Sequence, residues 1–213
     1  MRIVAISDLH TYLPKDLPKG DILVICGDIT LSARHDYLGQ AQFLNRTFKL
    51  WLQTIAADFK TIIGIAGNHD VVYENRPTMV NKLPWIYLQD SGCEVNGLKF
   101  WGCPWTKPFC NWGFNAEESF RQTLFNKIPV GTDIVLLHGP PYNIGLLDFA
   151  YGEHLGDPIL LEHIKRIGSK YVFCGHIHSG SGHEVKIGNT TIANVCYVDE
   201  DYQPIKKIYS FDI

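Results

Sequence analysis

The feature that most constrains the fold is a series of five short apolar runs separated by longer segments with helical spacing. The runs are rich in β-branched residues and occupy positions 3–6, 22–26, 62–66, 134–137 and 171–174. Near-continuous apolar runs of this length are typical of strands that are buried on both faces of a sheet. The alternation of such strands with helices predicts an α/β architecture.

Three segments between these runs are predicted to be helices, at residues 42–55, 116–125 and 158–167. The first has apolar side chains at mostly helical spacing. The second follows Asn115, a favourable N-cap residue, and carries glutamates in its first turn. The third follows Asp157 and begins with proline at the first helical position, where proline is tolerated.

The second half of the chain is richer in strands that pair through tight turns. Residues 94–96 and 98–102 flank Gly97, and residues 183–187 and 190–195 flank a Gly-Asn pair, which is a strong hairpin signal. Residues 205–211 are predicted to form the last strand. We therefore expect two sheets, one mixed and mostly parallel, the other more antiparallel, with helices outside them.

The length and composition fit one domain spanning residues 1–213. Of the 213 residues, 46% are hydrophobic and 19% are charged, which excludes a disordered or collagen-like chain. A formal net charge of −3 does not indicate a nucleic-acid or membrane surface by bulk charge. No apolar run approaches the roughly 18 residues of a membrane span, and the first residues leave no room for a signal peptide. We therefore expect a cytoplasmic location.

Polar side chains follow each of the five predicted strands at the point where the strand ends. They are carboxylates, an amide and imidazoles, namely Asp8, His10, Asp28, Asn68, His69, His138, His176 and His178. Sites in open α/β sheets form outside the carboxyl ends of the strands, so we expect these side chains at one rim. Neighbouring glycines permit the tight turns and close backbone approach that such a rim requires.

These residue types form a mixed ligand set for metal ions. Carboxylate and amide oxygens suit Mn or Mg, and imidazoles suit Zn, Fe, Ni or Mn. Seven ligands from this set of eight side chains are too many for one tetrahedral zinc ion. They suit two ions that share a carboxylate, and such a centre stabilises an in-line displacement. Each motif alone also fits a structural role, as a buried core histidine or a turn aspartate. Their shared position at strand ends favours the metal site.

Together these motifs resemble those of the calcineurin-like metallophosphoesterase superfamily. The resemblance rests on Asp8-x-His10, Gly27-Asp28, Gly67-Asn68-His69-Asp70, His138 and Gly175-His176-x-His178. Segments 27–30, 111–115, 131–134 and 138–141 are most similar to the metallophosphoesterase-domain-containing (MPPED) branch. The family fold is a four-layer αββα sandwich of two mixed sheets flanked by helices, which agrees with the two sheets expected from the sequence pattern.

The resemblance implies two metal ions and one general acid. It assigns three side chains to each ion and one carboxylate to both: Asp8, His10 and His178 for the first, Asn68, His138 and His176 for the second, and Asp28 as the bridge. His69 would contact phosphate and donate a proton to the leaving group. The implied enzyme is a phosphodiesterase in which a metal-bridging hydroxide attacks phosphorus in line. Mn is the expected ion, with Fe, Zn, Mg or Ni as alternatives.

One departure from a subfamily bears on the substrate. Protein Ser/Thr phosphatases of this superfamily carry a second Asp and an Arg where this sequence has Leu31 and Ser32. Phosphoproteins are therefore less favoured than small phosphodiesters such as cyclic nucleotides, and the usual carboxylate partner of the catalytic histidine is missing. Asp70 adjoins His69 and is a candidate to orient it, although adjacent side chains often point apart.

Two other functions remain open at this level. A metal-dependent nuclease of the same superfamily is disfavoured because Lys206 and Lys207 form the single basic cluster. A catalytically silent scaffold that binds a nucleotide or a protein is disfavoured because no expected ligand is missing.

Several residues outside the motifs have both a functional and a structural interpretation. The aromatic-rich segment 101–114 could stack a nucleobase or aryl group, or pack as core. The remaining candidates are pocket-wall or phosphate-contact residues that equally fit surface positions: Phe149, Tyr151, His154, His183, Arg34 and His35.

Overall fold

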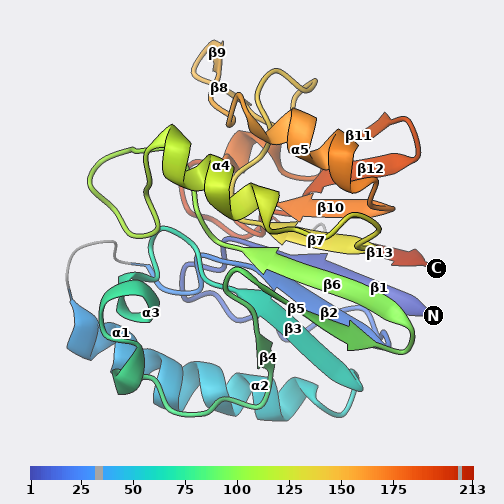
Figure 1. Ribbon diagram of the computed structural model, residues 1–213. Helices are drawn as coiled ribbons and strands as arrows, with labels where there is room; N and C mark the ends of the chain where they lie inside the picture. The colour runs from blue at the N-terminus through green and yellow to red at the C-terminus, as the bar shows by residue number, and fades with distance from the viewer. Residues whose placement is uncertain (32–35, 206–207) are drawn as a thin grey trace.

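Two β-sheets lie face to face between two layers of helices in the computed structural model, which describes residues 1–31, 36–205 and 208–213 (Figure 1). The first sheet has five strands in the order β13-β1-β2-β3-β4. Its strands are β1 (Arg2–Ile6), β2 (Ile22–Cys26), β3 (Thr61–Ile65), β4 (Ile86–Tyr87) and β13 (Tyr209–Asp212). All pairs are parallel except β1 with β13, as a mostly parallel sheet requires.

The second sheet has six strands in the order β11-β12-β10-β7-β6-β5. Its strands are β5 (Ser91–Val95), β6 (Leu98–Cys103), β7 (Ile134–Leu137), β10 (Tyr171–Cys174), β11 (Glu184–Ile187) and β12 (Thr190–Asn194). Its two outer pairs are antiparallel and its three inner pairs are parallel, so this sheet has the larger antiparallel share, as expected. Both expected hairpins are confirmed, with Val95 opposite Leu98 and Ile187 opposite Thr190.

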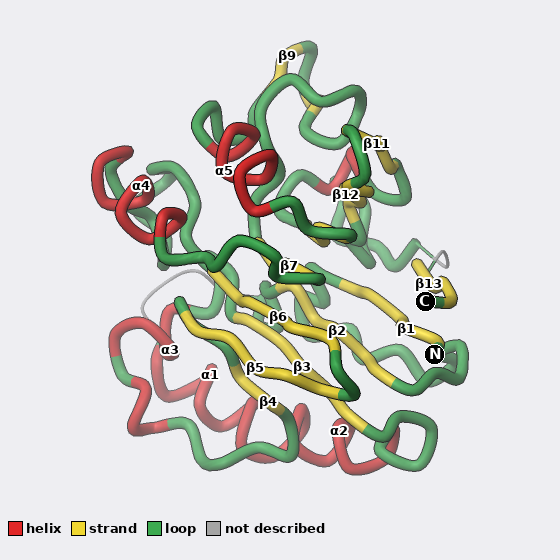
Figure 2. The backbone as a smooth tube through the Cα atoms, turned by 45° about the vertical axis from the view of Figure 1, so that its right-hand side comes forward, coloured by secondary structure: helices red, strands yellow, loops and turns green. Residues whose placement is uncertain are grey.

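Helices cover the outer face of each sheet (Figure 2). They are α1 (Tyr37–Phe43), α2 (Lys49–Ile55), α3 (Val71–Asn75), α4 (Glu118–Asn126) and α5 (Leu160–Ile167). A π-helical turn at Leu44–Phe48 joins α1 to α2. The chain also forms 3-10 turns at Pro77–Met79 and His178–Gly180 and a small hairpin of β8 (Phe149–Ala150) and β9 (Glu153–His154).

Several predicted element boundaries were wrong for identifiable reasons. The helix predicted at 42–55 begins earlier, at Tyr37, because Asp36 caps it by accepting a hydrogen bond from Gly39 N. Asn115 is not an N-cap, since its side chain binds Thr106 and the backbone of the preceding loop. The third helix begins two residues later than predicted, at Leu160. The last strand begins at Tyr209, and residues 206–207 lie outside the described part of the chain.

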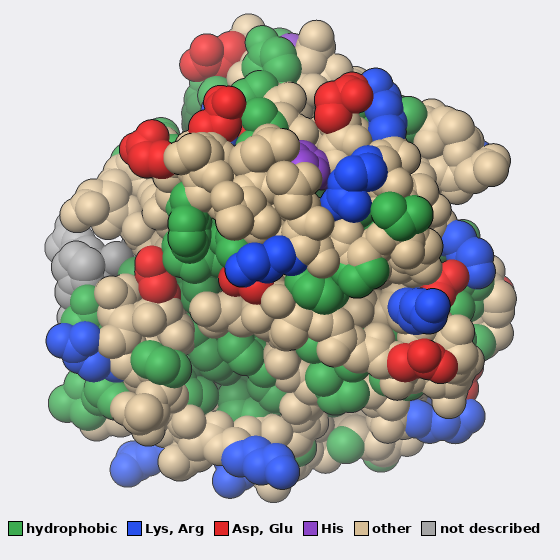
Figure 3. Space-filling model, in the orientation of Figure 1, with side chains coloured by type: hydrophobic (Ala, Val, Ile, Leu, Met, Phe, Trp, Pro, Cys, Tyr) green, Lys and Arg blue, Asp and Glu red, His purple; other side chains and the backbone are tan. Residues whose placement is uncertain are grey.

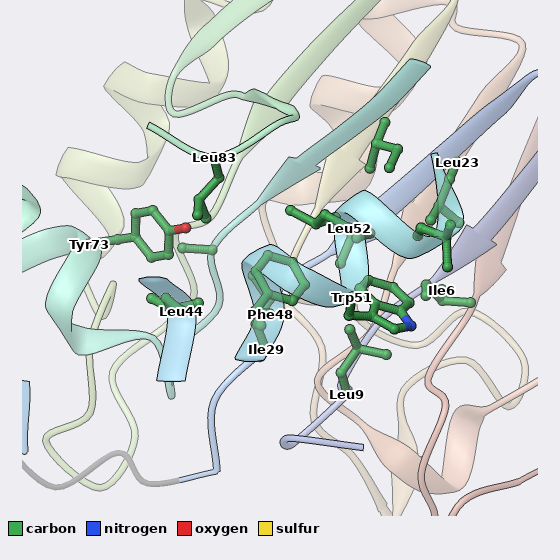
Figure 4. Close-up of a cluster of buried hydrophobic side chains, with 14 of the residues drawn as sticks. Ile6, Leu9, Leu23, Ile29, Leu44, Phe48, Trp51, Leu52, Tyr73 and Leu83 are labelled. Atoms are coloured by element: carbon green, nitrogen blue, oxygen red, sulfur yellow. The ribbon is translucent and has the colours of Figure 1, made fainter. Parts of the chain in front are cut away.

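Three hydrophobic clusters hold the four layers together. One lies between the first sheet and α1–α2, where Phe48 and Trp51 stack beside Leu52 and Ile29 (Figure 4). A second fills the space between the sheets, and a third lies under α4 and α5. Burial of apolar area at roughly 25 cal/mol per Å² is the main force that stabilises such layers.

The two sheets are also joined through backbone hydrogen bonds next to the candidate site. Ser7 follows β1 and donates its N–H to Val195 O at 2.8 Å, while Tyr197 N donates to Ser7 O at the same distance. The end of β1 therefore meets the segment that leaves β12, and this places residues of both sheets at one rim. On the face drawn in Figure 3, acidic and basic side chains are interspersed. None of the helices in the described ranges is both long and apolar enough to cross a bilayer.

Candidate metal centre

The turns that follow β1, β2, β3, β7 and β10 converge at one end of the sheets. The arrowheads of β3, β6 and β10 point to this same side in Figure 1. All eight side chains predicted from the sequence lie here, and those of the first sheet are almost fully buried. The expectation of a single rim, drawn from strand ends alone, agrees with this arrangement.

The first group of candidate ligands comprises Asp8, His10 and His178, whose ligand atoms all lie within 4.8 Å of one another. His178 Nε2 is 3.3 Å from Asp8 Oδ1 and 3.2 Å from His10 Nε2. His10 Nε2 is 3.9 Å from Asp8 Oδ1. Three ligand atoms from the turns after β1 and β10 therefore face one small volume.

The second group comprises Asp28, His138 and His176, with the Asn68 amide beside it. His138 Nε2 is 3.3 Å from Asp28 Oδ2 and 2.7 Å from Asn68 Oδ1. Asp28 Oδ2 is also 3.8 Å from His10 Nε2, so this carboxylate lies between the two groups.

The hydrogen bonds of the imidazoles show which ring nitrogen faces the site. His178 Nδ1 lies 2.9 Å from Asp199 O, and His138 Nδ1 lies 2.9 Å from Cys26 O. A carbonyl only accepts, so each Nδ1 carries hydrogen and, in the neutral ring, each Nε2 presents a lone pair to the centre. Lone pairs and carboxylate oxygens packed this closely require cations among them, and anchoring by carbonyls is typical of metal-binding histidines. The donor set therefore fits two metal ions.

In the metal-free protein, protonated histidine side chains balance the negative charge of the carboxylates. Burial alone would lower the pKa of His138, but the Asp28 charge and hydrogen bond raise it to about 9. Burial lowers the pKa of His10 to about 4 and that of His176 to about 3. For Asp28, burial opposes ionisation, but the facing His138 and His69 hold its pKa well below the usual range. Burial alone would lower the pKa of His178 as well, but its hydrogen bond with Asp8 and the charge of that carboxylate raise it. Protonated imidazole beside ionised carboxylates thus balances the charge of the centre.

The backbone at the centre is strained at several of the candidate ligands. Asp8, His10, Asp28 and His176 have φ angles of 53°, 41°, 51° and 68°, in the left-handed region that non-glycine residues rarely adopt. Such strain persists where the surrounding structure fixes it, and it concentrates at functional sites. Gly175 allows the last turn to approach, because a Cβ there would lie 1.9 Å from Asp8 Oδ2.

His69 lies at the edge of this cluster and is held by two hydrogen bonds. Its backbone N donates to Asp28 Oδ1 at 2.7 Å, and its Nδ1 lies 2.8 Å from Leu31 O. Its Nε2 is 4.0 Å from Asp28 Oδ2 and faces the centre. The carbonyl of Leu31 therefore orients the ring.

Asp70 does not orient the His69 ring. Its carboxylate is fully buried and accepts hydrogen bonds from Gly67 N, Ile29 N and both the N and Oγ1 of Thr30. Asp70 thereby joins the turn after β2 to the turn after β3. Burial, together with the nearby Asp28 charge, raises the pKa of Asp70 to about 6.

Two further contacts at the centre had no signal in the sequence. Cys196 Sγ lies 3.1 Å from Asp8 Oδ2, and His176 N donates to the same carboxylate at 3.0 Å. Cys26 and Cys174 are the last residues of β2 and β10, and Cys196 lies two residues after β12, so an apolar neighbourhood could not single it out. The carbonyl partners of the imidazoles are equally invisible in a sequence.

A cavity of about 500 Å³ opens beside the centre. Its lining includes five of the candidate site residues and a set of aromatic and charged side chains, among them Lys107, Phe109, Trp112, Tyr151, Glu200 and Tyr202. Both interpretations of the aromatic-rich segment 101–114 therefore apply to part of it: Phe109 and Trp112 line the cavity, whereas Phe114 is fully buried in the core.

The other described residues with both a functional and a structural interpretation lie outside this lining. Phe149 and His154 belong to the β8–β9 hairpin outside the cavity lining, where His154 pairs with the buried Asp148. His183 is an exposed residue just before β11. Arg34 and His35 lie outside the residues that the structure describes.

Comparison with known proteins agrees with this geometry. The sequence model of calcineurin-like phosphoesterases matches residues 1–180, a range that includes every candidate site residue. Metallophosphoesterase domain-containing protein 1 of Homo sapiens is 31% identical over 246 residues, an alignment that covers 100% of this chain and 71% of the human protein.

Solved structures share the fold at low sequence identity. A protein of Thermus thermophilus aligns with a TM-score of 0.59 at 11% identity, covering 99% of this chain and 98% of that one. Phosphopantetheinyl hydrolase from Mycobacterium tuberculosis aligns with a TM-score of 0.57 at 14% identity, covering 98% and 95%. Because the sequence match spans most of the chain and all of the strand-end motifs, this protein belongs to the calcineurin-like phosphoesterase family.

Proposed function

We propose that the protein is a dinuclear metal-dependent phosphodiesterase that hydrolyses small phosphodiesters such as cyclic nucleotides. The observation that carries the proposal is the convergence of imidazole lone pairs and carboxylates in two groups with Asp28 between them. The first ion would be held by Asp8, His10 and His178, and the second by Asn68, His138 and His176. Asp28 would serve both. Mn²⁺ suits this mixture of oxygen and imidazole ligands.

The chain's own residues would position the ester and supply a proton. Two bound ions lower the pKa of water and offset charge on phosphate oxygens. His69 Nδ1 is held by Leu31 O, so its Nε2 faces the centre, where it can hold a proton for the departing oxygen. The cavity beside the centre has the size of sites that take a single small ligand, which supports a small diester rather than a protein chain.

The proposal is tested with metal-reconstituted protein and a panel of esters. The panel contains an aryl phosphodiester, an aryl monoester, 2′,3′- and 3′,5′-cyclic nucleotides and a phosphopeptide. We expect the diesters to turn over fastest, the activity to vanish with a chelator and to return with Mn²⁺. Asp28→Asn should abolish turnover and weaken binding of both ions, whereas His183→Ala, an exposed histidine away from the centre, should change neither.

Three results would contradict parts of this proposal. Hydrolysis that persists in chelator would exclude the metal mechanism. Faster turnover of the monoester or phosphopeptide would reassign the substrate. Metal binding without hydrolysis of any ester would favour the catalytically silent scaffold.

A further inference from the structure

The cavity beside the metal centre has two different aromatic sides. On one side Trp112 lies against His69, with ring centroids 4.6 Å apart, and Phe109 meets the Trp112 ring edge-on at 5.2 Å. On the other side Tyr202 lies against His10 and His178, with centroids 4.7 and 5.2 Å apart. The two sides therefore differ in which part of the centre they border: the candidate acid or the first ligand group.

The loop that carries Trp112 is fastened to the turn that carries His69. Gly113 N donates to Asn68 O at 2.9 Å, and Phe114 N donates to Glu74 Oε2 at 2.7 Å. Glu74 lies in α3, directly after the His69 turn. One backbone contact and one contact to a side chain thus fix the loop that carries Trp112 relative to the turn that carries His69.

The same loop has features of a binding loop rather than of core packing. Cys110, Asn111 and Phe114 have φ angles of 54°, 52° and 49°, and such strain concentrates at sites of function. Asn115 holds the strained loop through Phe109 N, Thr106 Oγ1 and Gly113 O. Phe109 is 54% exposed and Trp112 is half-buried, so both rings present free faces to the cavity.

The place of the departing group follows from the place of the proton donor. In an in-line displacement the departing oxygen must lie within hydrogen-bond reach of the group that protonates it. With His69 in that role, whatever is attached to the departing oxygen lies next to Trp112, whose ring centroid is 4.6 Å from that of His69, against 6.4 Å for Tyr202. The group that stays on phosphorus lies on the opposite part of the cavity.

We propose that Trp112 and Phe109 form a leaving-group subsite that selects phosphodiesters whose departing alcohol carries a planar aromatic ring, either an aryl group or a nucleobase. This inference rests on the proposed function, because it takes His69 as the acid. Stacking on one aromatic side chain is worth roughly 5- to 150-fold in affinity per base. In a diester of two separate alcohols, the subsite therefore discriminates by the departing half of the substrate and is indifferent to the retained half.

The test uses two diesters with the same retained group and departing alcohols of similar acidity. Methyl phenyl phosphate loses a planar phenol, whereas methyl hexafluoroisopropyl phosphate loses a branched, non-planar alcohol. We expect Trp112→Ala to lower kcat/KM for the phenyl ester about 10- to 100-fold and for the fluoroalkyl ester less than about 3-fold. Phe109→Ala should act in the same direction, and Trp112→Phe should restore most of the preference for phenyl. Tyr142→Ala, an exposed aromatic outside the cavity lining, is the matched control.

A binding measurement keeps the inference testable apart from turnover. Calorimetric titration of the Mn²⁺-loaded protein with phenylphosphonate and methylphosphonate gives the affinity ratio for the ring. That ratio should fall about 10- to 100-fold in Trp112→Ala with the metal content unchanged. Equal losses for both esters, or an unchanged phosphonate ratio, would overturn the subsite. If wild-type protein hydrolyses neither ester but the ratio still falls, Trp112 binds the ring, and the proposed hydrolysis and the leaving-group role fail together.

Discussion

At the scale of single residues, the catalytic assignment depends on how His69 differs from the histidines around it. His138 and His178 each have Nδ1 on a carbonyl and Nε2 within 3.3 Å of a carboxylate oxygen. The Nε2 of His69 stays 4.0 Å from Asp28, at the border of the cavity. His10, an assigned ligand, also lies 3.8 Å from Asp28, so distance alone does not separate the two roles. The position of His69 at the cavity border favours proton donation over metal binding.

This difference leads to an expected split between metal content and turnover. His69→Ala should retain both ions, because none of the assigned ligands is removed. The variant should nevertheless lose about 10²- to 10⁴-fold in kcat, the usual contribution of a general acid. Elemental analysis of the reconstituted variant, beside its steady-state kinetics, checks both parts. Loss of one ion in His69→Ala would instead make His69 a ligand.

The buried thiol of Cys196 is expected to tune metal affinity through Asp8. Cys196→Val keeps an apolar side chain but removes the donor to Asp8 Oδ2, and loss of such a supporting contact typically costs about 10- to 100-fold in metal affinity. Cys196→Ser keeps a donor and should lose much less. Calorimetric Mn²⁺ titration measures both.

The matched control is Cys174→Val, since the Cys174 thiol is also buried but donates to Ala193 O. We expect this change to leave the Mn²⁺ affinity within about twofold. Similar losses in both valine variants would mean that packing, and not the contact to Asp8, sets the affinity.

The sequence predicted the residues of this centre better than the groups that form hydrogen bonds to them. Asp8, Asp28 and His138 could be found because their side-chain types and strand-end positions carry the chemistry. The Leu31 carbonyl that orients the His69 ring could not be found, because every residue has a carbonyl and only the fold decides where it points. The role of Cys196 depends on a strand meeting across the two sheets, which no local pattern records.

At the scale of elements, tight turns at the strand ends decide how closely the ligands approach. Gly67 and Gly175 have no space for a side chain: a Cβ at Gly67 would lie 2.3 Å from Asp28 Oδ1, and one at Gly175 would lie 2.2 Å from Ser7 Oγ. Buried strands were predictable because their apolar runs are continuous. Helix starts were less predictable, since Asn115 serves a loop in place of a helix cap.

Gly175→Ala is expected to damage the centre by crowding rather than by backbone strain. The new methyl group would push on the Asp8 carboxylate and on Ser7, and such overpacking typically costs about 1–3 kcal/mol of unfolding free energy. Mn²⁺ affinity should fall as well, because Asp8 must move. Urea unfolding and calorimetry measure the two effects.

Gly131→Ala separates the two causes. Gly131 has a φ of 79° with open space around it, so alanine there adds strain without a clash. We expect that variant to lose stability and keep its Mn²⁺ affinity. If Gly175→Ala also kept wild-type affinity, the close approach at Asp8 would not matter for the ligand geometry.

At the scale of the whole molecule, the centre straddles the joint between the sheets. Asp8 and Asp28 follow strands of the first sheet, and His138 and His176 follow strands of the second. Ions held by both sides would link the two halves of the sandwich. The four-layer order was predictable from the strand and helix pattern together with the family resemblance. The joint between the sheets was not, because it depends on contacts between residues far apart in the sequence, such as Ser7 and Val195.

Metal binding should therefore stabilise the whole fold. At an ion concentration about 100 times Kd the native state gains about 2.7 kcal/mol, and for a chain of this size each kcal/mol shifts Tm by about 2–4 °C. We expect Mn²⁺ to raise the Tm by about 5–10 °C over the chelator-treated protein, and Asp28→Asn to lose most of that rise. Thermal unfolding followed by circular dichroism makes the measurement.

This stabilisation should grow with pH, because the pKa values of His138 and His178 are both raised in the metal-free fold. The pKa of His138 is raised to about 9, so this ring carries a proton at pH 6 that an ion must displace. His10 and His176, with pKa values lowered to about 4 and 3, are already neutral there and do not compete. The proton on His138 stabilises the metal-free fold below its ordinary pKa, and this contribution is lost as pH rises through about 9.

Between about pH 6 and 8 the free energy of Mn²⁺ binding should therefore become more favourable, by up to about 2.7 kcal/mol for the His138 proton. The Mn²⁺-induced rise in Tm should increase with it. His183→Ala should show the same pH dependence as the wild type, and a rise in Tm that is constant or larger at about pH 6 would contradict a protonated His138 in the metal-free centre.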